Sequence, residues 1–136
     1  RQRQMCIRDR VKSMFPEEAE ILNQSDIHIH VPAGAVPKDG PSAGITIVTA
    51  LTSMLKEKGI SPEYAMTGEV SLRGGVMPIG GLPEKLMAAQ RAGIRTVFIP
   101  YENREDLEDV ADEVKEDLTI IPVKRIEEVL QKTNLI

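Results

Sequence analysis

The stretch "PSAGITIVTALTSMLKEKG", residues 41–59, decides the fold, because its composition allows either a helix or a strand. Apolar residues recur in it at helical spacing, whereas the β-branched run at residues 45–48 favours a strand. Pro41 suits a first helical position, Gly59 suits a stop, and lysines near the end complement the helix dipole. Length and these caps together predict a deeply buried helix.

Short strands and further helices flank this helix on both sides. "DIHIHVP" (26–32) alternates apolar and polar residues and predicts a half-buried strand, and "EYAMTGEVSLRGGVMPIGG" (63–81) predicts a strand, a glycine turn and a second strand. The remaining predictions are a helix at 11–22 interrupted by Pro16, helices at 82–93 and 125–133, strands at 94–100 and 118–123, and a helical acidic segment at 102–117. This alternation indicates an α/β (α+β) domain of small mixed sheets packed against helices.

The first ten residues, "RQRQMCIRDR", differ from the rest of the chain. They contain four arginines and show neither helical nor strand periodicity. The sequence therefore predicts a disordered or artefactual tail at residues 1–10 and one domain at residues 11–136.

Composition excludes several classes of protein. A net charge of −4 and few aromatic residues give no footprint for nucleic-acid binding. Cys6 is the single cysteine, which excludes an internal disulfide and a cysteine-based zinc site. No apolar run approaches the ~20 residues of a membrane span, and no signal peptide is visible, so a cytoplasmic location is the default expectation.

Ser42 in "GPSAG" is a candidate nucleophile, because the motif matches the G-x-S-x-G elbow of α/β-hydrolases. That fold needs a histidine after the serine, and both histidines precede it here, so the α/β-hydrolase interpretation is excluded. A relay from His28 or His30 through Asp39 to Ser42 stays open, because triads occur in several chain orders.

Two other patterns carry no site. "GVMPIGG" (75–81) has the glycines of a phosphate-binding loop but lacks its lysine and hydroxyl residue, which excludes nucleotide hydrolysis by this chain. Asp26, His28 and His30 share one strand face, but no further ligand stands at a telling spacing, so no metal site is predicted.

Lys85 has two interpretations. At the first turn of a helix a positive charge is disfavoured by the dipole, so Lys85 is either a solvated surface residue or a lysine whose neutral form is useful. Burial and the helix start would both lower its pKa and make it a general base. Thr67, on one strand face with Glu69, could hydrogen-bond such an amine; otherwise the two are an ordinary exposed strand pair.

With these residues in view, the chain resembles the C-terminal proteolytic domain of the ATP-dependent, A-type Lon proteases. The resemblance rests on three long, correctly ordered stretches, which are "HVPAGAVPKDGPSAG", "MTGEVSLRGGVMPIGGLPEKLMAAQRAGI" and "IPVKRIEEVL". It implies the Lon proteolytic-domain fold, in an N-terminally truncated form. It also implies that Ser42 is the nucleophile and Lys85 its base, with supporting roles for Thr67, Glu69, His28, His30 and Asp39.

The resemblance also implies a context. A Lon-type serine endopeptidase degrades unfolded or damaged proteins, works as a homo-hexamer, and takes ATP and magnesium in a separate ATPase module, with no cofactor in the proteolytic domain. The expected location is the cytoplasm, or the mitochondrial matrix in a eukaryote. Two alternatives remain, namely a non-catalytic fragment that serves ring assembly and a hydrolase using the His28/His30–Asp39 relay.

Overall fold

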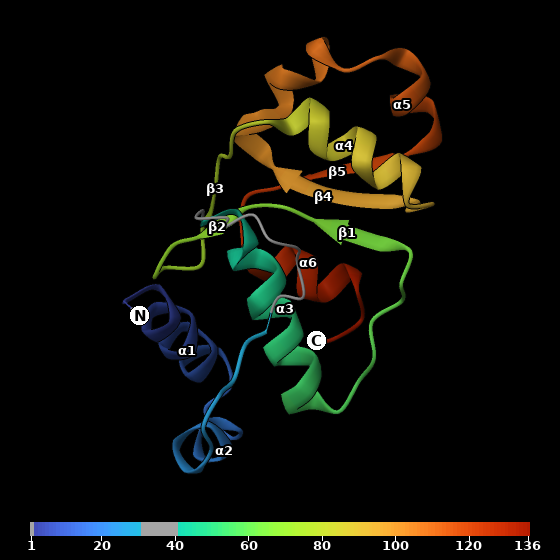
Figure 1. Cartoon of the computed structure of the whole chain (residues 1–136). Coiled ribbons are helices and arrows are strands. Elements are labelled where there is room, and N and C mark those ends of the chain that lie inside the picture. The colour runs from blue at the N-terminus through green and yellow to red at the C-terminus, as the bar shows by residue number, and fades with distance from the viewer. Residues whose placement is uncertain (1, 31–40) are drawn as a thin grey trace.

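The computed structural model describes residues 2–30 and 41–136, with the side chains of residues 7–30 and 42–136 (Figure 1). In chain order the elements are α1 (Gln2–Met14), α2 (Ala19–Gln24), the 3-10 helix η1 (Pro41–Ala43), α3 (Gly44–Lys56), β1 (Tyr64–Met66), β2 (Glu69–Val70), β3 (Val76–Met77), α4 (Leu82–Arg91), β4 (Thr96–Pro100), the 3-10 helix η2 (Tyr101–Asp109), α5 (Asp112–Asp117), β5 (Thr119–Val123) and α6 (Ile126–Lys132).

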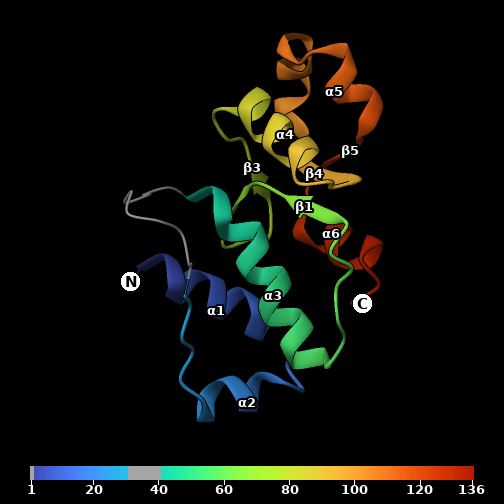
Figure 2. The same cartoon turned by 45° about the vertical axis from the view of Figure 1, so that its right-hand side comes forward.

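A parallel sheet in the order β1-β4-β5 lies between two layers of helices (Figures 1 and 2). α4 and α5 cover one face, and α3 and α6 cover the other. Side chains of β4 alternate between the two, since Val97 and Ile99 pack with α4 and α5 whereas Phe98 packs with α3 and α6. The predicted α/β (α+β) class, with small sheets packed against helices, is confirmed.

The helix predicted at residues 41–59 is confirmed. One 3-10 turn, η1, precedes α3, and α3 buries Ile45, Val48 and Leu51 against the sheet. The helix ends in a left-handed residue, Glu57, with φ +52°, two residues before the predicted stop at Gly59. The apolar spacing thus outweighs the β-branched run, because tertiary burial rewards the whole helical face.

The strand predicted from residue 63 onward is divided between two sheets. β1 pairs with β4, whereas β2 pairs with β3 in a separate antiparallel hairpin. Thr67 and Gly68 lie at the crossing, so the prediction that Thr67 and Glu69 share one strand face is wrong. The physical reason is that the backbone leaves β4 after Thr67 and turns toward α3, where the Gly68 amide donates to the Ser42 carbonyl.

The strand predicted at residues 26–32 is not formed over its described part, residues 26–30. Ile27 and Ile29 are half-buried while Asp26, His28 and His30 are exposed, so the two predicted faces are present. No described strand pairs with this segment. Alternating burial therefore arises from contact with α3, and alternation without a hydrogen-bonded neighbour does not make a strand. Residues 31 and 32 lie outside the described residues.

Residues 2–10, predicted to be disordered, are helical as part of α1. Ile7 and Val11 are buried beside α3, and this packing accounts for a helix that local periodicity does not reveal. The helix predicted at 11–22 is broken near Pro16 as expected, with α1 ending at Met14 and α2 beginning at Ala19.

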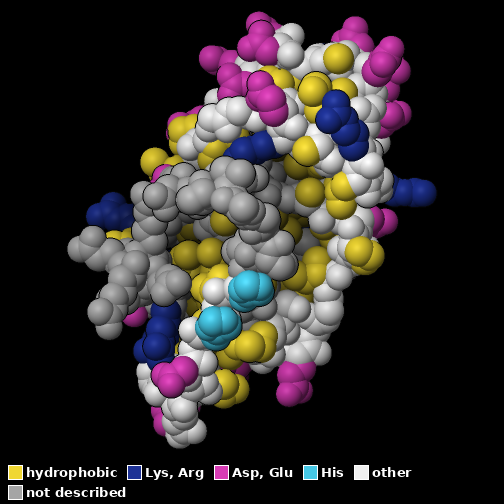
Figure 3. Space-filling view, in the orientation of Figure 1, with side chains coloured by type: hydrophobic (Ala, Val, Ile, Leu, Met, Phe, Trp, Pro, Cys, Tyr) yellow, Lys and Arg dark blue, Asp and Glu magenta, His cyan; other side chains and the backbone are white. Residues whose placement is uncertain are grey.

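The remaining elements follow the sequence closely. α4, β4, β5 and α6 are confirmed, and the acidic segment is helical in two pieces, η2 and α5. Acidic side chains gather over this end of the molecule in Figure 3. Among the described residues, no helix has the length and apolar character that crossing a bilayer requires.

Candidate active site

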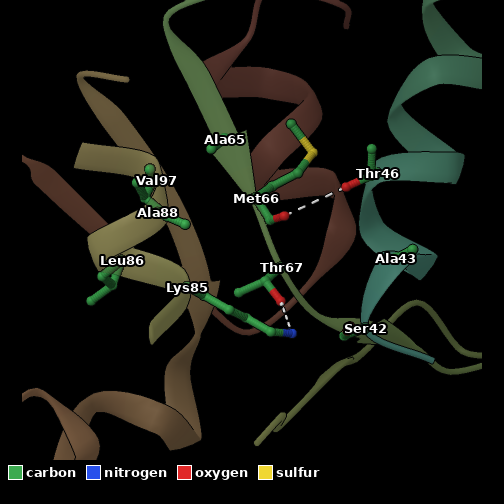
Figure 4. Close-up of a pocket in the computed structure, with 11 residues that line it drawn as sticks. Ser42, Ala43, Thr46, Ala65, Met66, Thr67, Lys85, Leu86, Ala88 and Val97 are labelled. Carbon is green, nitrogen blue, oxygen red and sulfur yellow. Dashed lines mark hydrogen bonds between the residues drawn. The ribbon is translucent and has the colours of Figure 1, made fainter. Parts of the chain in front are cut away.

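A cavity of about 320 Å³ lies between the start of α3, the end of β1 and the first turns of α4 (Figure 4). Ser42, Thr67 and Lys85 all line it, so three residues from distant parts of the sequence meet there. The other lining residues are small or apolar, namely Ala43, Thr46, Ala65, Met66, Leu86, Ala88, Ala89 and Val97. The cavity therefore offers three hydroxyls, from Ser42, Thr46 and Thr67, and one amine in otherwise apolar surroundings.

Lys85 extends from α4 toward Thr67. Its Nζ donates a hydrogen bond to Thr67 Oγ1 at 3.1 Å, and the Thr67 residue is only 7% exposed. Burial lowers the pKa of the Lys85 amine below its ordinary value of 10.5. Desolvation thus favours the neutral amine, which is the form that can accept a proton.

Ser42 is held through its backbone. Its carbonyl accepts a hydrogen bond from the Gly68 amide at 2.9 Å, and the Ile45 amide donates to the Gly68 carbonyl at 3.0 Å. These two bonds tie the start of α3 to the segment between β1 and β2. The approach is close, since a Cβ atom at Gly44 would lie 3.1 Å from the Val70 nitrogen. Gly44 therefore allows the packing that sets the position of Ser42.

Figure 4 shows the Lys85 side chain reaching across the mouth of the cavity toward the side on which Ser42 lies. Within the described residues the hydrogen-bond partner of Lys85 Nζ is Thr67, and Ser42 and Lys85 make no direct hydrogen bond. Catalytic hydrogen bonds are often long without substrate and shorten in the reacting complex. A hydroxyl and a partly desolvated amine beside one cavity are the parts of an acyl-transfer site.

The predicted supporting residues are placed in different surroundings. His28 and His30 stack with ring centroids 6.5 Å apart on the surface (Figure 3, cyan) and line a larger cavity along α3 that adjoins the Ser42 cavity at Ala43 and Thr46. Glu69 is half-buried on β2 and does not line the Ser42 cavity. Asp39 lies outside the described residues. Of the four that the structure describes, only Thr67 forms a hydrogen bond with a predicted catalytic side chain.

The described part of the chain contains no cluster of three or more His, Cys, Asp or Glu side chains able to share a metal ion. In the sequence, Asp26, His28 and His30 share one face of the predicted strand. In the structure these three side chains do not form such a cluster.

Gly68 is a site residue that sequence reasoning missed. It contributes only backbone groups, and its role appears once the chain crosses from β1 to β2 beside α3. The apolar lining was also missed, because Ala65, Leu86 and Val97 look like ordinary core residues in sequence. No side-chain pattern could have identified either feature.

Comparison of the sequence with known proteins places this chain in a family. Residues 2–135 match the family model described as the Lon protease (S16) C-terminal proteolytic domain. The match covers nearly the whole chain.

Individual relatives agree. The chain is 60% identical to the Lon protease of Escherichia coli (strain K12) over 111 residues, covering 82% of this chain and 14% of that protein. It is 56% identical to the Lon protease of Methanosarcina barkeri over 111 residues, with the same coverage. It is also 56% identical to the Lon protease of Clostridium beijerinckii over 123 residues, 90% of this chain and 16% of that protein. The chain thus spans about one seventh of the length of the relatives it matches.

Proposed function

The chain belongs to the Lon protease (S16) family as its C-terminal proteolytic domain, and from this premise we propose that Ser42 is the catalytic nucleophile and Lys85 its general base. Membership makes the chain a Lon-type serine protease domain, a hydrolase, and implies that its substrates are proteins. The assignment of the two residues is our inference from their chemistry and surroundings.

One observation carries this proposal. Two adjacent residues hold the two proposed partners, since Thr67 accepts the hydrogen bond of the Lys85 amine and Gly68 donates to the Ser42 carbonyl. A single short segment between β1 and β2 therefore fixes the amine and the serine backbone relative to each other. Such shared anchoring is the preorganisation that a nucleophile and its base require.

In the first step, neutral Lys85 accepts the proton of Ser42 Oγ as that oxygen attacks the carbonyl carbon of a peptide bond. The tetrahedral intermediate collapses when the C–N bond breaks, and the leaving amine takes a proton from the Lys85 ammonium. The products of this step are a new amino terminus and an ester between the substrate acyl group and Ser42. In this proposal, backbone amides close to Ser42, other than that of Ile45, stabilise the oxyanion.

In the second step, Lys85 accepts a proton from water as the water attacks the ester carbonyl. The C–Oγ bond breaks, Ser42 Oγ regains a proton from the Lys85 ammonium, and the carboxylic acid product leaves and loses its own proton to the solvent. Thr67 keeps the amine oriented in both steps. The cycle restores Ser42 and neutral Lys85, so no cofactor takes part in the chemistry of this domain.

The wider activity is proposed by analogy with the family. We propose that the substrates are unfolded or damaged polypeptides, that the domain works in a homo-hexamer, and that ATP and magnesium act in an ATPase module outside this chain. A cytoplasmic location, or the mitochondrial matrix in a eukaryote, accords with these roles. Replacing the matched segment of the Escherichia coli protein with that of this chain and measuring oligomer mass and ATP-dependent casein degradation tests all except the location.

Two alternatives predict different results in that chimera. A non-catalytic assembly role predicts hexamers that hydrolyse ATP and degrade nothing. A histidine relay predicts that activity depends on His28 or His30, whose side chains line a cavity other than that of Ser42. The shared anchoring at Thr67 and Gly68 favours Lys85 over both.

Covalent labelling tests the dyad directly. Incubation of the chimera with a fluorophosphonate, followed by intact mass and peptide mapping, is expected to place one adduct on Ser42. Ser42→Ala abolishes it and Lys85→Met slows it by at least about a hundredfold, as expected for loss of a general base. The His28→Ala, His30→Ala double variant is the matched control and labels at the parent rate. Loss of labelling in that control, with Lys85→Met labelling normally, would reject the dyad.

A further inference from the structure

Asn103 is a buried polar residue that the proposed mechanism does not use. It lies in η2 within an otherwise exposed acidic segment, yet it is only 3% exposed. A buried amide is retained only where its hydrogen bonds are satisfied, because leaving them unmade costs free energy. Its partners therefore indicate what the side chain does.

Those partners are mainly the backbone groups of one residue, Ile79, in the loop between β3 and α4. Asn103 Oδ1 accepts from the Ile79 amide at 2.9 Å, and Asn103 Nδ2 donates to the Ile79 carbonyl at 2.8 Å. Nδ2 also donates to Asp106 Oδ2 at 2.7 Å, which orients the amide from within η2. The side chain thus binds both backbone groups of Ile79, as a neighbouring strand would.

Ile79 stands directly before the start of α4. Gly80 and Gly81 follow it, Gly81 has φ +71° in the left-handed region, and its carbonyl accepts the amide hydrogen of Lys85 at 3.2 Å. Two consecutive glycines are conformationally free, so on their own they would not set where α4 begins. The two hydrogen bonds from Asn103 to the backbone of Ile79, the residue before the glycine pair, supply the restraint on where α4 begins.

We propose that Asn103 is a positioning residue, which fixes the start of α4 through Ile79 and Gly81 and thereby aims Lys85 at the Ser42 cavity. Asn103 does not itself line that cavity. The proposal rests on the proposed function, since it gives Lys85 its role as base. It concerns the placement of the base, and it requires no contact between Asn103 and substrate.

Loss of the amide has a definite consequence. Without the two bonds to Ile79, the glycine pair is free to rotate and the first turn of α4 shifts relative to β1. Lys85 Nζ then loses its alignment with Thr67 and becomes more solvated. Small displacements of a catalytic group cost up to about a hundredfold in rate. Substrate contacts elsewhere are unchanged, so the loss belongs to kcat and not to KM.

Steady-state peptide hydrolysis by the 136-residue chain tests this with Asn103→Ala. We expect kcat to fall by about tenfold to a hundredfold with KM changed by less than about threefold, and the acid limb of the pH–rate profile to move to higher pH. Val114→Ala is the matched control, because Val114 is buried in the same cluster as α4 and its truncation loosens packing while leaving both hydrogen bonds between Asn103 and Ile79 in place. It is expected to keep the parent pH profile.

A second variant and a second readout keep the test decisive. Asn103→Leu keeps most of the side-chain volume and introduces no charge next to Asp106, but it removes both hydrogen bonds to Ile79, so it replaces Asn103→Ala in the test if that variant does not fold. Lys85 Cε is followed in each variant by ¹³C NMR against pH, with the Lys85→Arg spectrum as assignment. A pKa of Lys85 that lies nearer 10.5 in the Asn103 variants than in the parent supports the proposal. This holds even if the parent cleaves no peptide, and in that case only the proposed function fails. An unchanged Lys85 titration and unchanged kcat, or the same losses in Val114→Ala, would overturn it.

Discussion

Lys85 places its amine in a partly buried cavity, where burial lowers its pKa and opposes the stability of the charged form. The unfolded chain binds a proton at Lys85 up to about its ordinary pKa of 10.5, whereas the folded chain releases it at lower pH. Between those two pKa values the unfolded state binds more protons, so stability rises with pH in this window. At pH values below the pKa of Lys85 in the folded chain, the amine is charged in both states and the full free-energy cost of burying that charge is present.

Because the charged Lys85 amine lowers the stability of the folded chain, we predict that Lys85→Met is stabilising. Methionine keeps an apolar stem in the cavity and carries no charge, so the variant is expected to melt at a higher temperature than the parent at pH 7. The difference shrinks as the pH approaches 10.5. Thermal melts by circular dichroism from pH 6 to pH 10 check this. A variant less stable than the parent at every pH contradicts the view that Lys85 is held at a cost for function.

Thr67 gives a second prediction at the scale of a residue. Thr67→Val removes the acceptor of the Lys85 hydrogen bond while keeping its shape, so kcat is expected to fall about tenfold or more with stability changed by roughly 1 kcal/mol.

Thr67→Ser retains a hydroxyl and is the matched control, expected to keep most of the parent's activity. Peptide hydrolysis and urea unfolding of both variants decide the matter. Equal activity in Thr67→Val and Thr67→Ser would show that the hydroxyl does not orient the amine.

The crossing between β1 and β2 is the element that brings the site together, and its glycine is sterically required. A Cβ atom at Gly68 would lie 2.7 Å from Val76 Cγ1, in a stiff β-branched side chain. Gly68→Ala is therefore expected to destabilise the fold by about 1–3 kcal/mol and to displace the Ser42 backbone that Gly68 holds.

Gly59→Ala provides the comparison, because no atom lies within 4 Å of the position of its added Cβ. Urea denaturation followed by circular dichroism is expected to show a lower midpoint for Gly68→Ala and no decrease for Gly59→Ala. A parent-like midpoint and parent-like activity in Gly68→Ala would mean that the crossing yields without consequence.

The sequence predicted individual elements better than it predicted their connections. α3 and β4 can be predicted from the sequence. The helical spacing of apolar residues in α3 and the short apolar run in β4 both reflect burial, which stabilises these elements whatever they pack against. The division of residues 63–70 between two sheets cannot be predicted from local periodicity, because it depends on the contact between α3 and Gly68. For residues 26–30 the alternation of buried and exposed side chains was predicted correctly, but no described strand pairs with them, so they do not form a strand.

For the site, the residues alone left Ser42 and Lys85 among several candidates, and the family resemblance selected them. The structure adds what neither supplied, namely the shared anchoring through Thr67 and Gly68 and the buried contact of Asn103 with Ile79. Backbone contacts of this kind have no signature in a single sequence, because any residue has the amide or carbonyl involved.

At the scale of the whole molecule, one central strand joins the two packed layers. Phe98 on β4 is fully buried between the sheet and the α3 layer, next to Tyr64, with ring centroids 5.7 Å apart. Phe98→Ala is expected to cost about 3–5 kcal/mol, a large share of the stability of a domain of this size.

Met54 on α3 is 56% exposed, so Met54→Ala is the control and is expected to cost little. Chemical denaturation of the two variants compares them. Little loss of stability in Phe98→Ala would contradict a fold organised around β4.

The role of Lys85 as the base is decided by the pH dependence of kcat/KM for peptide hydrolysis by the Escherichia coli chimera, compared between the parent and Lys85→Met. If Lys85 is the base, the parent rate rises with pH through a pKa below 10.5, and the variant is folded and hexameric but lacks both that limb and nearly all turnover. Substantial turnover in Lys85→Met with the same acid limb would show that another group is the base and that Ser42 is not activated by Lys85.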